Sequence, residues 1–269
     1  EYGRPLEALA ALMDRFTVRA LYFNRDYEPY ARERERAVHE LCQARGVALH
    51  HYKDHVIFDR AEILAGQGQP YRVFTPYSRQ WLARLVAADH LAEAPSAALA
   101  AQPGALAAVQ APPLPTLARM GFADGGGPDF PSPTLAQETL RRYAARRNFP
   151  AEASTSRLGV HLRFGTVSIR ALARQALPES EVFLKELIWR DFYAQVLWHH
   201  PHVVGHACKP QFEAVAFRQA PDELARWQRG LTGYPLVDAG MRELAATGFM
   251  HNRVRMVAAS FLVKHLLID

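Results

Sequence analysis

A proline- and glycine-rich stretch divides the chain and limits what its two sides can fold into. Eight of the 18 prolines lie within residues 95–133, together with three consecutive glycines and long runs of alanine. Proline removes a backbone donor and glycine favours irregular backbone, so a packed α or β core is not expected there. We therefore predict an interdomain linker at 95–133, between a domain at 1–94 and a domain at 134–269.

The first domain alternates strand-like and helix-like segments. Residues 20–23 form a short apolar strand-like run, 47–52 has the character of a second strand, and the charged segment 30–45 between them has helical character. A third strand-like run covers 71–74. Strand, helix and strand at this spacing indicate a parallel α/β layer. Three strands make a small sheet, so we expect further strands upstream of the first residue.

The second domain has a helical pattern almost throughout. Ser132-Pro133 marks a capped helix start before residues 135–147. Helical periodicity then continues over 167–176, 180–199, 221–229 and 235–264. The predicted fold is an α/β N-terminal layer followed by an all-α domain.

Charge is spread unevenly along the chain. The formal net charge is +5, with −1 in residues 1–133 and +6 in residues 134–269. A basic half favours a polyanion such as nucleic acid as partner, although solubility alone could also require it. No apolar run is long enough for a membrane span, and we expect neither a membrane partner nor a signal peptide.

Cysteine and histidine usage points away from a metal site. Cys42 and Cys208 are the only cysteines and lack metal-ligand spacing, which predicts a reducing, cytoplasmic environment. Four histidines cluster around Pro201, but no cysteine or second histidine pair accompanies them. We interpret them as a solvated helix end and predict no bound metal.

A short polar segment, TSRLG at residues 155–159, precedes an apolar stretch that contains Arg163. Hydroxyls, backbone N–H groups and a guanidinium at the mouth of a helical region suit a phosphate or pyrophosphate. The same residues also make an ordinary helix cap, and both interpretations stay open on this segment alone.

The segment ELIWRDFY places three functional side chains on one helix face. Glu186, Trp189 and Arg190 stand at i, i+3 and i+4, so a carboxylate, an indole and a guanidinium share a side. The carboxylate and guanidinium could form a simple exposed pair. A half-buried indole beside them is a stacking platform for a base or another flat ring.

The segment 232–264 is apolar on a helical period but is interrupted by the polar cluster HNRVRM. On a helix Asn252 and Met256 share a side, and Arg253 and Arg255 fan around the same turn. These groups suggest a pocket for a flat, polar-edged ligand beside an anion. The alternative is a surface turn of an ordinary helix.

Taken together, these motifs resemble the photolyase/cryptochrome flavoprotein family, most of all its class I cyclobutane pyrimidine dimer photolyases. The resemblance is carried in the helical part by TSRLG, ELIWRDFY and TGYPLVDAGMRELAATGFMHNRVRM, in this order. In the first part, FNRDYEP and YRVFTPYSRQW look like the family's antenna-domain segments. The resemblance implies a Rossmann-like antenna domain followed by an all-α flavin-binding domain, both incomplete in this chain.

The resemblance also implies a bound FAD. The positions that match its phosphate and ribityl contacts are Tyr143, Thr155, Ser156, Arg157 and Leu158. Asn252 and Arg255 match positions beside the flavin ring. Many relatives have serine where this chain has Gly159, which removes one side-chain contact.

A flipped-out pyrimidine dimer in DNA is the substrate that the resemblance implies. Trp189 matches the residue that stacks on the dimer, and Glu186 matches the acid that binds a thymine edge and steadies the radical anion. The remaining matches to lesion or phosphate contacts are Arg190, Asn252, Arg253 and Met256. Of these residues, Glu186, Asn252 and Met256 are the predicted catalytic ones.

The expected activity is therefore light-driven repair of pyrimidine dimers by electron transfer from reduced FAD, in a cytoplasmic monomer. The alternatives are a cryptochrome-type blue-light receptor without repair activity, or a flavin-free DNA-binding fragment. The antenna pigment is undecided between methenyltetrahydrofolate and a deazaflavin, although Asn24 and Glu28 lie where some relatives contact a folate.

Departures from the family pattern predict an internal fragment that lacks both family termini. The missing C-terminal part supplies the family's acidic partner of Arg255 and the inner tryptophans of its electron chain. Phe217 falls near the outermost tryptophan of that chain, and Phe249 stands where some relatives carry tryptophan.

Overall fold

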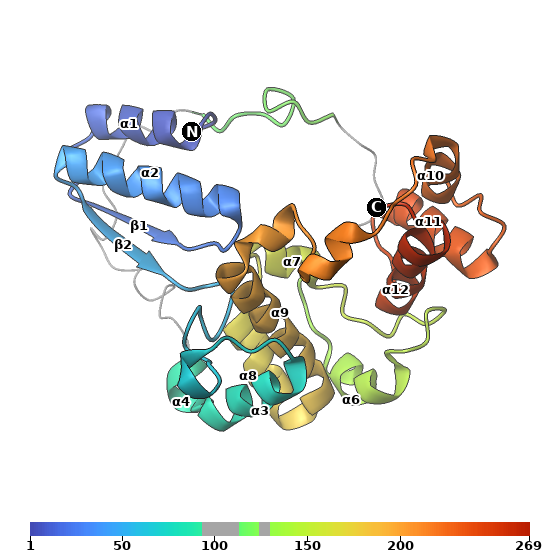
Figure 1. Cartoon of the computed structure of the whole chain (residues 1–269). Coiled ribbons are helices and arrows are strands. Elements are labelled where there is room, and N and C mark those ends of the chain that lie inside the picture. The colour runs from blue at the N-terminus through green and yellow to red at the C-terminus, as the bar shows by residue number, and fades with distance from the viewer. Residues whose placement is uncertain (93–112, 124–129) are drawn as a thin grey trace. The chain divides into compact units, whose positions relative to one another are not determined.

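The computed structural model describes residues 1–92, 113–123 and 130–269 (Figure 1). Most of the linker predicted at 95–133 lies outside the described residues, so the domain limits placed around it stay predictions. Within the described part of the chain, no helix is long and apolar enough to cross a membrane.

The chain forms two compact units, within each of which the residues make most of their contacts. Each unit is assembled from two stretches of sequence. Unit 1 comprises Glu1–Gly125 and His161–Pro201. Unit 2 comprises Gly126–Val160 and His202–Asp269. Each unit is described by itself below.

Unit 1 contains two parallel strands joined by a helix. β1 (Ala20–Asn24) pairs in parallel with β2 (Ala48–Tyr52), from Ala20 opposite Ala48 to Asn24 opposite Tyr52. α2 (Pro29–Arg45) connects them (Figure 1), with a proline in its first turn and the left-handed Gly46 after its last. Both are favoured at helix ends. The predicted parallel α/β layer is confirmed.

The core of this layer lies where α2 and α1 (Pro5–Arg15) meet the sheet. Val38 and Cys42 of α2 are buried with Val47, and Phe23 of β1 packs against them. Side chains alternate along a strand, so the neighbouring Tyr22 points to the other face and is exposed.

The prediction of a strand at 71–74 is wrong, because a helix begins there. α3 (Phe74–Arg84) starts at Phe74, and Pro76 stands in its first turn. Proline is tolerated at this place because the first N–H groups of a helix have no partner within it. A run of four residues is too short to distinguish a strand from a helix start.

Two further helices of unit 1 confirm the expected helical segments. α8 (Ile169–Glu179) and α9 (Glu181–His199) are separated by Ser180 alone, whose Oγ accepts a hydrogen bond from Phe183 N at 3.4 Å. Unit 1 also contains η1 (Gly66–Gly68) and α4 (Ala87–His90). α7 (Gly159–Phe164) and η2 (Pro201–Val204) cross the limits between the units, and η3 (Pro210–Ala214) belongs to unit 2.

A buried carboxylate on α9 holds the first part of unit 1 to this helix. Asp191 is 1% exposed, and its Oδ2 accepts hydrogen bonds from Ile57 N at 3.1 Å, Phe58 N at 3.0 Å and Trp81 Nε1 at 2.9 Å. One side chain of α9 thus holds two other parts of unit 1, namely α3 and the loop that follows β2. The charged and polar spacing of ELIWRDFY did not predict this role.

Asp191 also makes stability depend on pH. Burial raises the pKa of this carboxyl from 3.8 to about 7, although the three donors oppose the shift. Because the folded state binds this proton more tightly than the unfolded chain, the part of the stabilisation that depends on this proton is complete below about pH 4 and is lost as pH rises through about 7, whereas the hydrogen bonds of Asp191 contribute separately. We expect the free energy of unfolding to fall across this window relative to Asp191→Asn, as measured by urea denaturation. A pH-independent difference would contradict this.

Unit 2 is helical in its described part. Its α-helices are α6 (Gln137–Arg146), α10 (Pro221–Gln228), α11 (Pro235–Thr247) and α12 (Asn252–Ser260), and α12 continues into a π-helical turn, η4 (Phe261–His265). Its core lies between α11 and α12, and the buried residues are Val237, Met241, Met250, Val254, Ala258 and Phe261.

The single helix expected at 235–264 is broken, and this part of the prediction is wrong. α11 ends at Thr247, and the next residue, Gly248, has φ +69 and terminates the helix in the left-handed conformation. α12 starts four residues later, so the two form a hairpin instead of one rod (Figure 1). The glycine after Thr247 was the available signal for this break.

Candidate functional site

The HNRVRM segment forms the first turn of α12, and His251 attaches this turn to α6. His251 is 2% exposed, and its Nδ1 accepts a hydrogen bond from Arg253 N at 3.1 Å as the helix cap. Since Nδ1 accepts, Nε2 carries the proton and donates to the Arg147 carbonyl, 3.0 Å away. Arg253 Nε in turn donates to Asn148 Oδ1 at 2.9 Å. The start of α12 is thereby fixed against the end of α6.

The polar side chains that follow this cap are exposed. Asn252 Nδ2 lies 3.9 Å from Met256 Sδ, so the two side chains share a face as their spacing predicts. Met256 is 56% exposed. Arg255 is also exposed, and within the described residues no carboxylate lies in ion-pair range of it. An unpaired guanidinium beside an amide and a thioether can receive an anionic, flat ligand.

The TSRLG segment is held by its leucine and arginine. Leu158 is buried, and its N–H donates to Ser156 Oγ at 3.4 Å. Arg157 has φ +53, which is uncommon for a residue with a side chain, and its guanidinium lies 4.4 Å from the ring centroid of Phe249. The segment therefore lies against the residues just before α12. Strain of this kind often occurs at ligand sites.

Tyr143 adds α6 to the same region. It is half-buried, and the Arg147 guanidinium lies 5.4 Å from its ring centroid. The Arg147 carbonyl also accepts the hydrogen bond from His251. Unit 2 therefore brings together three separate segments that carry predicted flavin contacts: the C-terminal half of α6, residues 155–158 and the start of α12.

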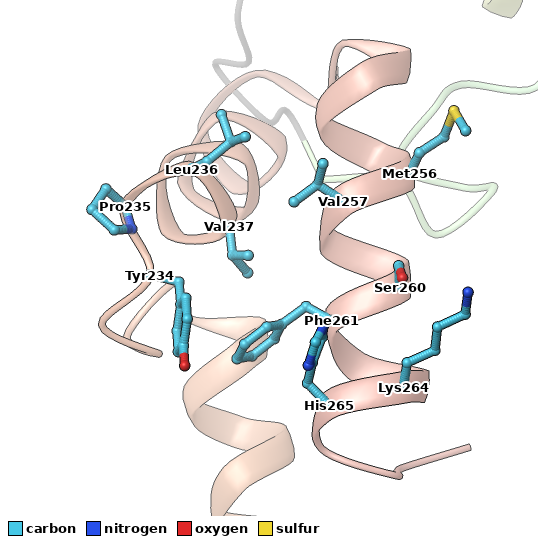
Figure 2. A pocket seen from close by; sticks show the side chains of 10 residues that line it. All are labelled: Tyr234, Pro235, Leu236, Val237, Met256, Val257, Ser260, Phe261, Lys264 and His265. Carbon is cyan, nitrogen blue, oxygen red and sulfur yellow. The ribbon is translucent and has the colours of Figure 1, made fainter.

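An open cavity of about 700 Å³ lies on α11 and α12 in the same unit. Figure 2 shows Val237, Val257 and Phe261 facing the space between the two helices, with Met256 and Lys264 along the other edge of α12. Its lining is mostly apolar and comprises Tyr234, Pro235, Leu236, Val237, Met256, Val257, Ser260, Phe261, Lys264 and His265.

Asp238 fixes the loop that precedes Tyr234, a residue of the cavity lining. Its carboxylate accepts hydrogen bonds from the Thr232 N–H at 2.8 Å, the Thr232 hydroxyl at 2.6 Å and the Gly233 N–H at 2.9 Å. The Thr232 hydroxyl bond, together with the backbone N–H bonds, lowers the pKa of Asp238. This carboxylate explains the spacing of TGYPLVDAG: the aspartate in the first turn of α11 holds the loop before Tyr234.

In unit 1, Trp189 is held in an aromatic stack. Its ring lies 3.6 Å from the Phe74 ring, with an interplanar angle of 5°, and 5.4 Å from the Tyr193 ring at 22°. Phe192 meets it edge-on at 5.6 Å. Phe74 lies in α3, far away in sequence, and no local pattern pointed to it. The stack fixes the plane of the indole on α9.

Glu186 and Arg190 lie on α9 beside Trp189, and both are half-buried. Arg190 Nε donates to the His55 carbonyl at 2.9 Å, and Nη2 donates to the Leu162 carbonyl at 3.0 Å. Burial lowers the pKa of this guanidinium. Contact with DNA would require Arg190 to give up these bonds, so its geometry favours an anchoring role, and the DNA contact stays a prediction.

The predicted site residues thus fall into two groups. Glu186, Trp189 and Arg190 gather on α9 in unit 1. The flavin-contact positions and the α12 residues gather in unit 2. No group of three histidine, cysteine or acidic side chains suited to a metal occurs among residues 1–92, 113–123 and 130–269.

Comparison with known proteins identifies the class. Residues 1–98 match the family described as DNA photolyase, and residues 183–269 match the FAD binding domain of DNA photolyase. The fold and the site therefore define a flavoprotein of the photolyase type, with an α/β layer followed by a helical FAD-binding domain. The chain belongs to the photolyase/cryptochrome family.

Individual relatives agree with this assignment. The chain is 37% identical to a deoxyribodipyrimidine photo-lyase of Halobacterium salinarum and 35% identical to one of Synechococcus, covering 100% and 99% of this chain. It spans 60% of the length of both. A bacterial class III photolyase from Agrobacterium tumefaciens superposes with a TM-score of 0.80 and 28% identity, covering 99% of this chain and 59% of that one. A cryptochrome of Synechocystis, at 22% identity and a TM-score of 0.75, shares the fold.

Proposed function

We propose that the protein repairs cyclobutane pyrimidine dimers in DNA with light, using reduced FAD. The observation that carries the proposal is the first turn of α12, where His251 holds an exposed face formed by Asn252, Arg255 and Met256. The proposal also draws on the relatives, which are named deoxyribodipyrimidine photo-lyase.

The residues of unit 2 fit FAD. The hydroxyls of Thr155 and Ser156, with Arg157, form a donor set suited to its diphosphate. Arg255, free of any described carboxylate, suits an anionic flavin ring, and Asn252 supplies donors and an acceptor for the polar ring edge. When bound and reduced, FAD supplies the light-excited electron that splits the cyclobutane ring and is afterwards recovered.

The protein's own contribution is to bind and orient the lesion. Flipping a damaged dinucleotide out of the duplex costs only a few kcal/mol, because damaged bases stack poorly. We propose that Trp189, held flat by Phe74, stacks on the dimer and that Glu186 binds a thymine edge. We propose that Arg253 and Met256 contact the lesion or its phosphates. The basic charge of residues 134–269 would attract the DNA backbone. Electron transfer requires no nucleophile or general base from the chain.

A blue-light receptor without repair activity is the second candidate. The family resemblance separates the two at Asn252 and Met256, which plant-type cryptochromes tend to replace. Both residues are present here and share the exposed face of α12, which favours repair.

A second, light-harvesting chromophore is part of the proposal, as methenyltetrahydrofolate or a deazaflavin. An archaeal photolyase from Sulfolobus tokodaii, which has the same fold, was solved with two FAD molecules. Of the two candidate folate contacts, Asn24 is exposed, whereas the Glu28 carboxylate pairs with Arg163 at 3.0 Å. We further expect a cytoplasmic monomer.

The purified protein is expected to show flavin absorbance and, once reduced and illuminated, to remove thymine dimers from irradiated DNA. Trp189→Ala should weaken binding to dimer-containing DNA by about 5- to 150-fold, because stacking contributes about 1–3 kcal/mol per base. Binding and dimer loss are measured in parallel, with the exposed Phe212→Ala as the control, which should leave both unchanged. Absence of flavin bands would reject both flavoprotein candidates, and bound, reduced flavin without dimer loss would reject repair.

A further inference from the structure

A second pocket of about 210 Å³ lies in unit 1, between α2, the sheet and the end of α9. α2 lines it with Arg32, Arg36 and His39, which recur at i, i+4 and i+7 on one helix face. Arg60 and Trp198 close the other side. None of these residues is among those predicted to hold FAD, the lesion or the antenna pigment.

The lining of this pocket carries more positive than negative charge. In the described part of the chain, Arg32 and Arg36 have no carboxylate within ion-pair range. Glu35 is the one acidic residue in the lining, and it already accepts a hydrogen bond from Asp26 N at 2.8 Å. Three arginines against one carboxylate in the lining leave an excess of positive charge, which raises the affinity for an anion.

Arg60 presents a second, independent signal. Its Nε is buried and has no hydrogen-bond partner among the described residues. The nearest carboxylate oxygen, Asp59 Oδ1, is 3.7 Å away, which is too far for a hydrogen bond, and the other oxygen of Asp59 is bound by Arg25. A buried donor without an acceptor costs free energy that a ligand could recover.

Trp198 is in contact with two of these cations. The guanidinium carbons of Arg32 and Arg60 lie 4.3 and 4.0 Å from the centroid of its ring. Cation–π attraction holds each of them on the indole, although their charges repel. The same potential reaches His51 in the lining, whose pKa is lowered by burial and then by Arg25 and Arg60.

We propose that this pocket binds a phosphate group, as free phosphate or as the phosphate of a small ester. Guanidinium forks match the geometry of phosphate oxygens and form charge-assisted hydrogen bonds with them. The volume is below the roughly 300–1,000 Å³ of pockets for larger ligands, so a dinucleotide such as FAD does not fit. The site is independent of light, flavin and the lesion.

The test is a calorimetric titration of the protein with inorganic phosphate and, separately, with glycerol 3-phosphate, at constant ionic strength. We expect saturable, one-site binding in the low millimolar range or tighter, and no saturation with chloride. Arg32→Gln and Arg60→Gln should each weaken it by about tenfold or more, since each removes a charge-assisted hydrogen-bond donor. Tighter binding of the ester would assign a small phosphomonoester, and tighter or equal binding of inorganic phosphate would assign the free ion.

Arg45→Gln is the matched control, because it removes the same charge from the C-terminal end of the same helix, outside the pocket lining, where Arg45 pairs with Asp14. It should leave the affinity within about twofold, since distant surface charge acts weakly in salt. Phosphate should also change the fluorescence of the unsubstituted protein, and Trp198→Phe should abolish that change. The proposal would be overturned if binding did not saturate, if Arg45→Gln weakened it as much as the two pocket variants, or if the fluorescence change survived Trp198→Phe. The fluorescence comparison still decides if an arginine variant fails to fold.

Discussion

Replacing Asp191 by alanine is expected to lower the free energy of unfolding by about 3–5 kcal/mol, because three buried donors lose their acceptor together. Those donors are Ile57 N, Phe58 N and Trp81 Nε1, at 2.9 to 3.1 Å from Asp191 Oδ2. Each unsatisfied buried donor costs about 1–3 kcal/mol, and the losses are not fully additive because the donors share one site. Urea denaturation near neutral pH measures the effect.

Asp191→Asn is the matched control, since it keeps an oxygen acceptor and the side-chain volume while removing the charge. It should cost clearly less than alanine at the same pH. If alanine and asparagine proved equal, or if alanine cost less than about 1 kcal/mol, the hydrogen bonds of Asp191 would not be what holds the loop after β2 to α9. Trp81 fluorescence would report locally on the same contact, because its Nε1 donates directly to the carboxylate.

Gly240→Ala is expected to destabilise unit 2 by about 3 kcal/mol, through overpacking of the α11–α12 interface. A Cβ at this position would lie 2.2 Å from Val254 Cγ1, closer than non-bonded carbons approach each other, and 3.6 Å from Met250 Cε. Val254 is 4% exposed and packed in the core, so it has little room to move. The same variant should loosen the hold of α12 and thereby weaken flavin retention. Thermal unfolding and the flavin content of the purified protein measure the two effects.

A double-mutant cycle separates the clash from other causes. Val254→Ala alone leaves a small cavity, whereas the double variant Gly240→Ala/Val254→Ala exchanges one methyl position for another. The double variant should therefore be less destabilised than the sum of the single variants by at least about 1 kcal/mol. Gly205→Ala serves as the control glycine in the same unit, because nothing lies within 4 Å of an added Cβ there. Additive effects in the cycle would argue that helix propensity, and not contact with Val254, explains the loss.

Local spacing predicted part of the fold and of the candidate site correctly. The parallel strands and their connecting helix, α8, α9 and the shared face of Asn252 and Met256 all follow from periodicity within a few residues. Errors arose where short apolar runs or continuous periodicity left the choice open. The run at 71–74 continued into α3, and the expected helix at 235–264 broke at Gly248.

The contacts that fix the site residues in place were beyond prediction. His251 caps α12 and also binds the Arg147 carbonyl, yet histidine is not among the residues favoured at helix N-caps. Likewise, Arg190 was expected to face DNA, but its guanidinium binds the carbonyls of His55 and Leu162. Residue type and spacing describe what a side chain can bind, and they leave open which partner it finds.

The sequence by itself determined the α/β layer, the helical second part, the family and the polar faces of α9 and α12, because each depends on residue order over one or two helical turns or on a local motif. Only the tertiary structure decided that Asp191 meets Ile57, that Phe74 stacks on Trp189, and that Arg32 and Arg60 meet at one indole. The first of these pairs is separated by 134 residues. Such contacts are set by how whole elements pack together, which no local propensity encodes.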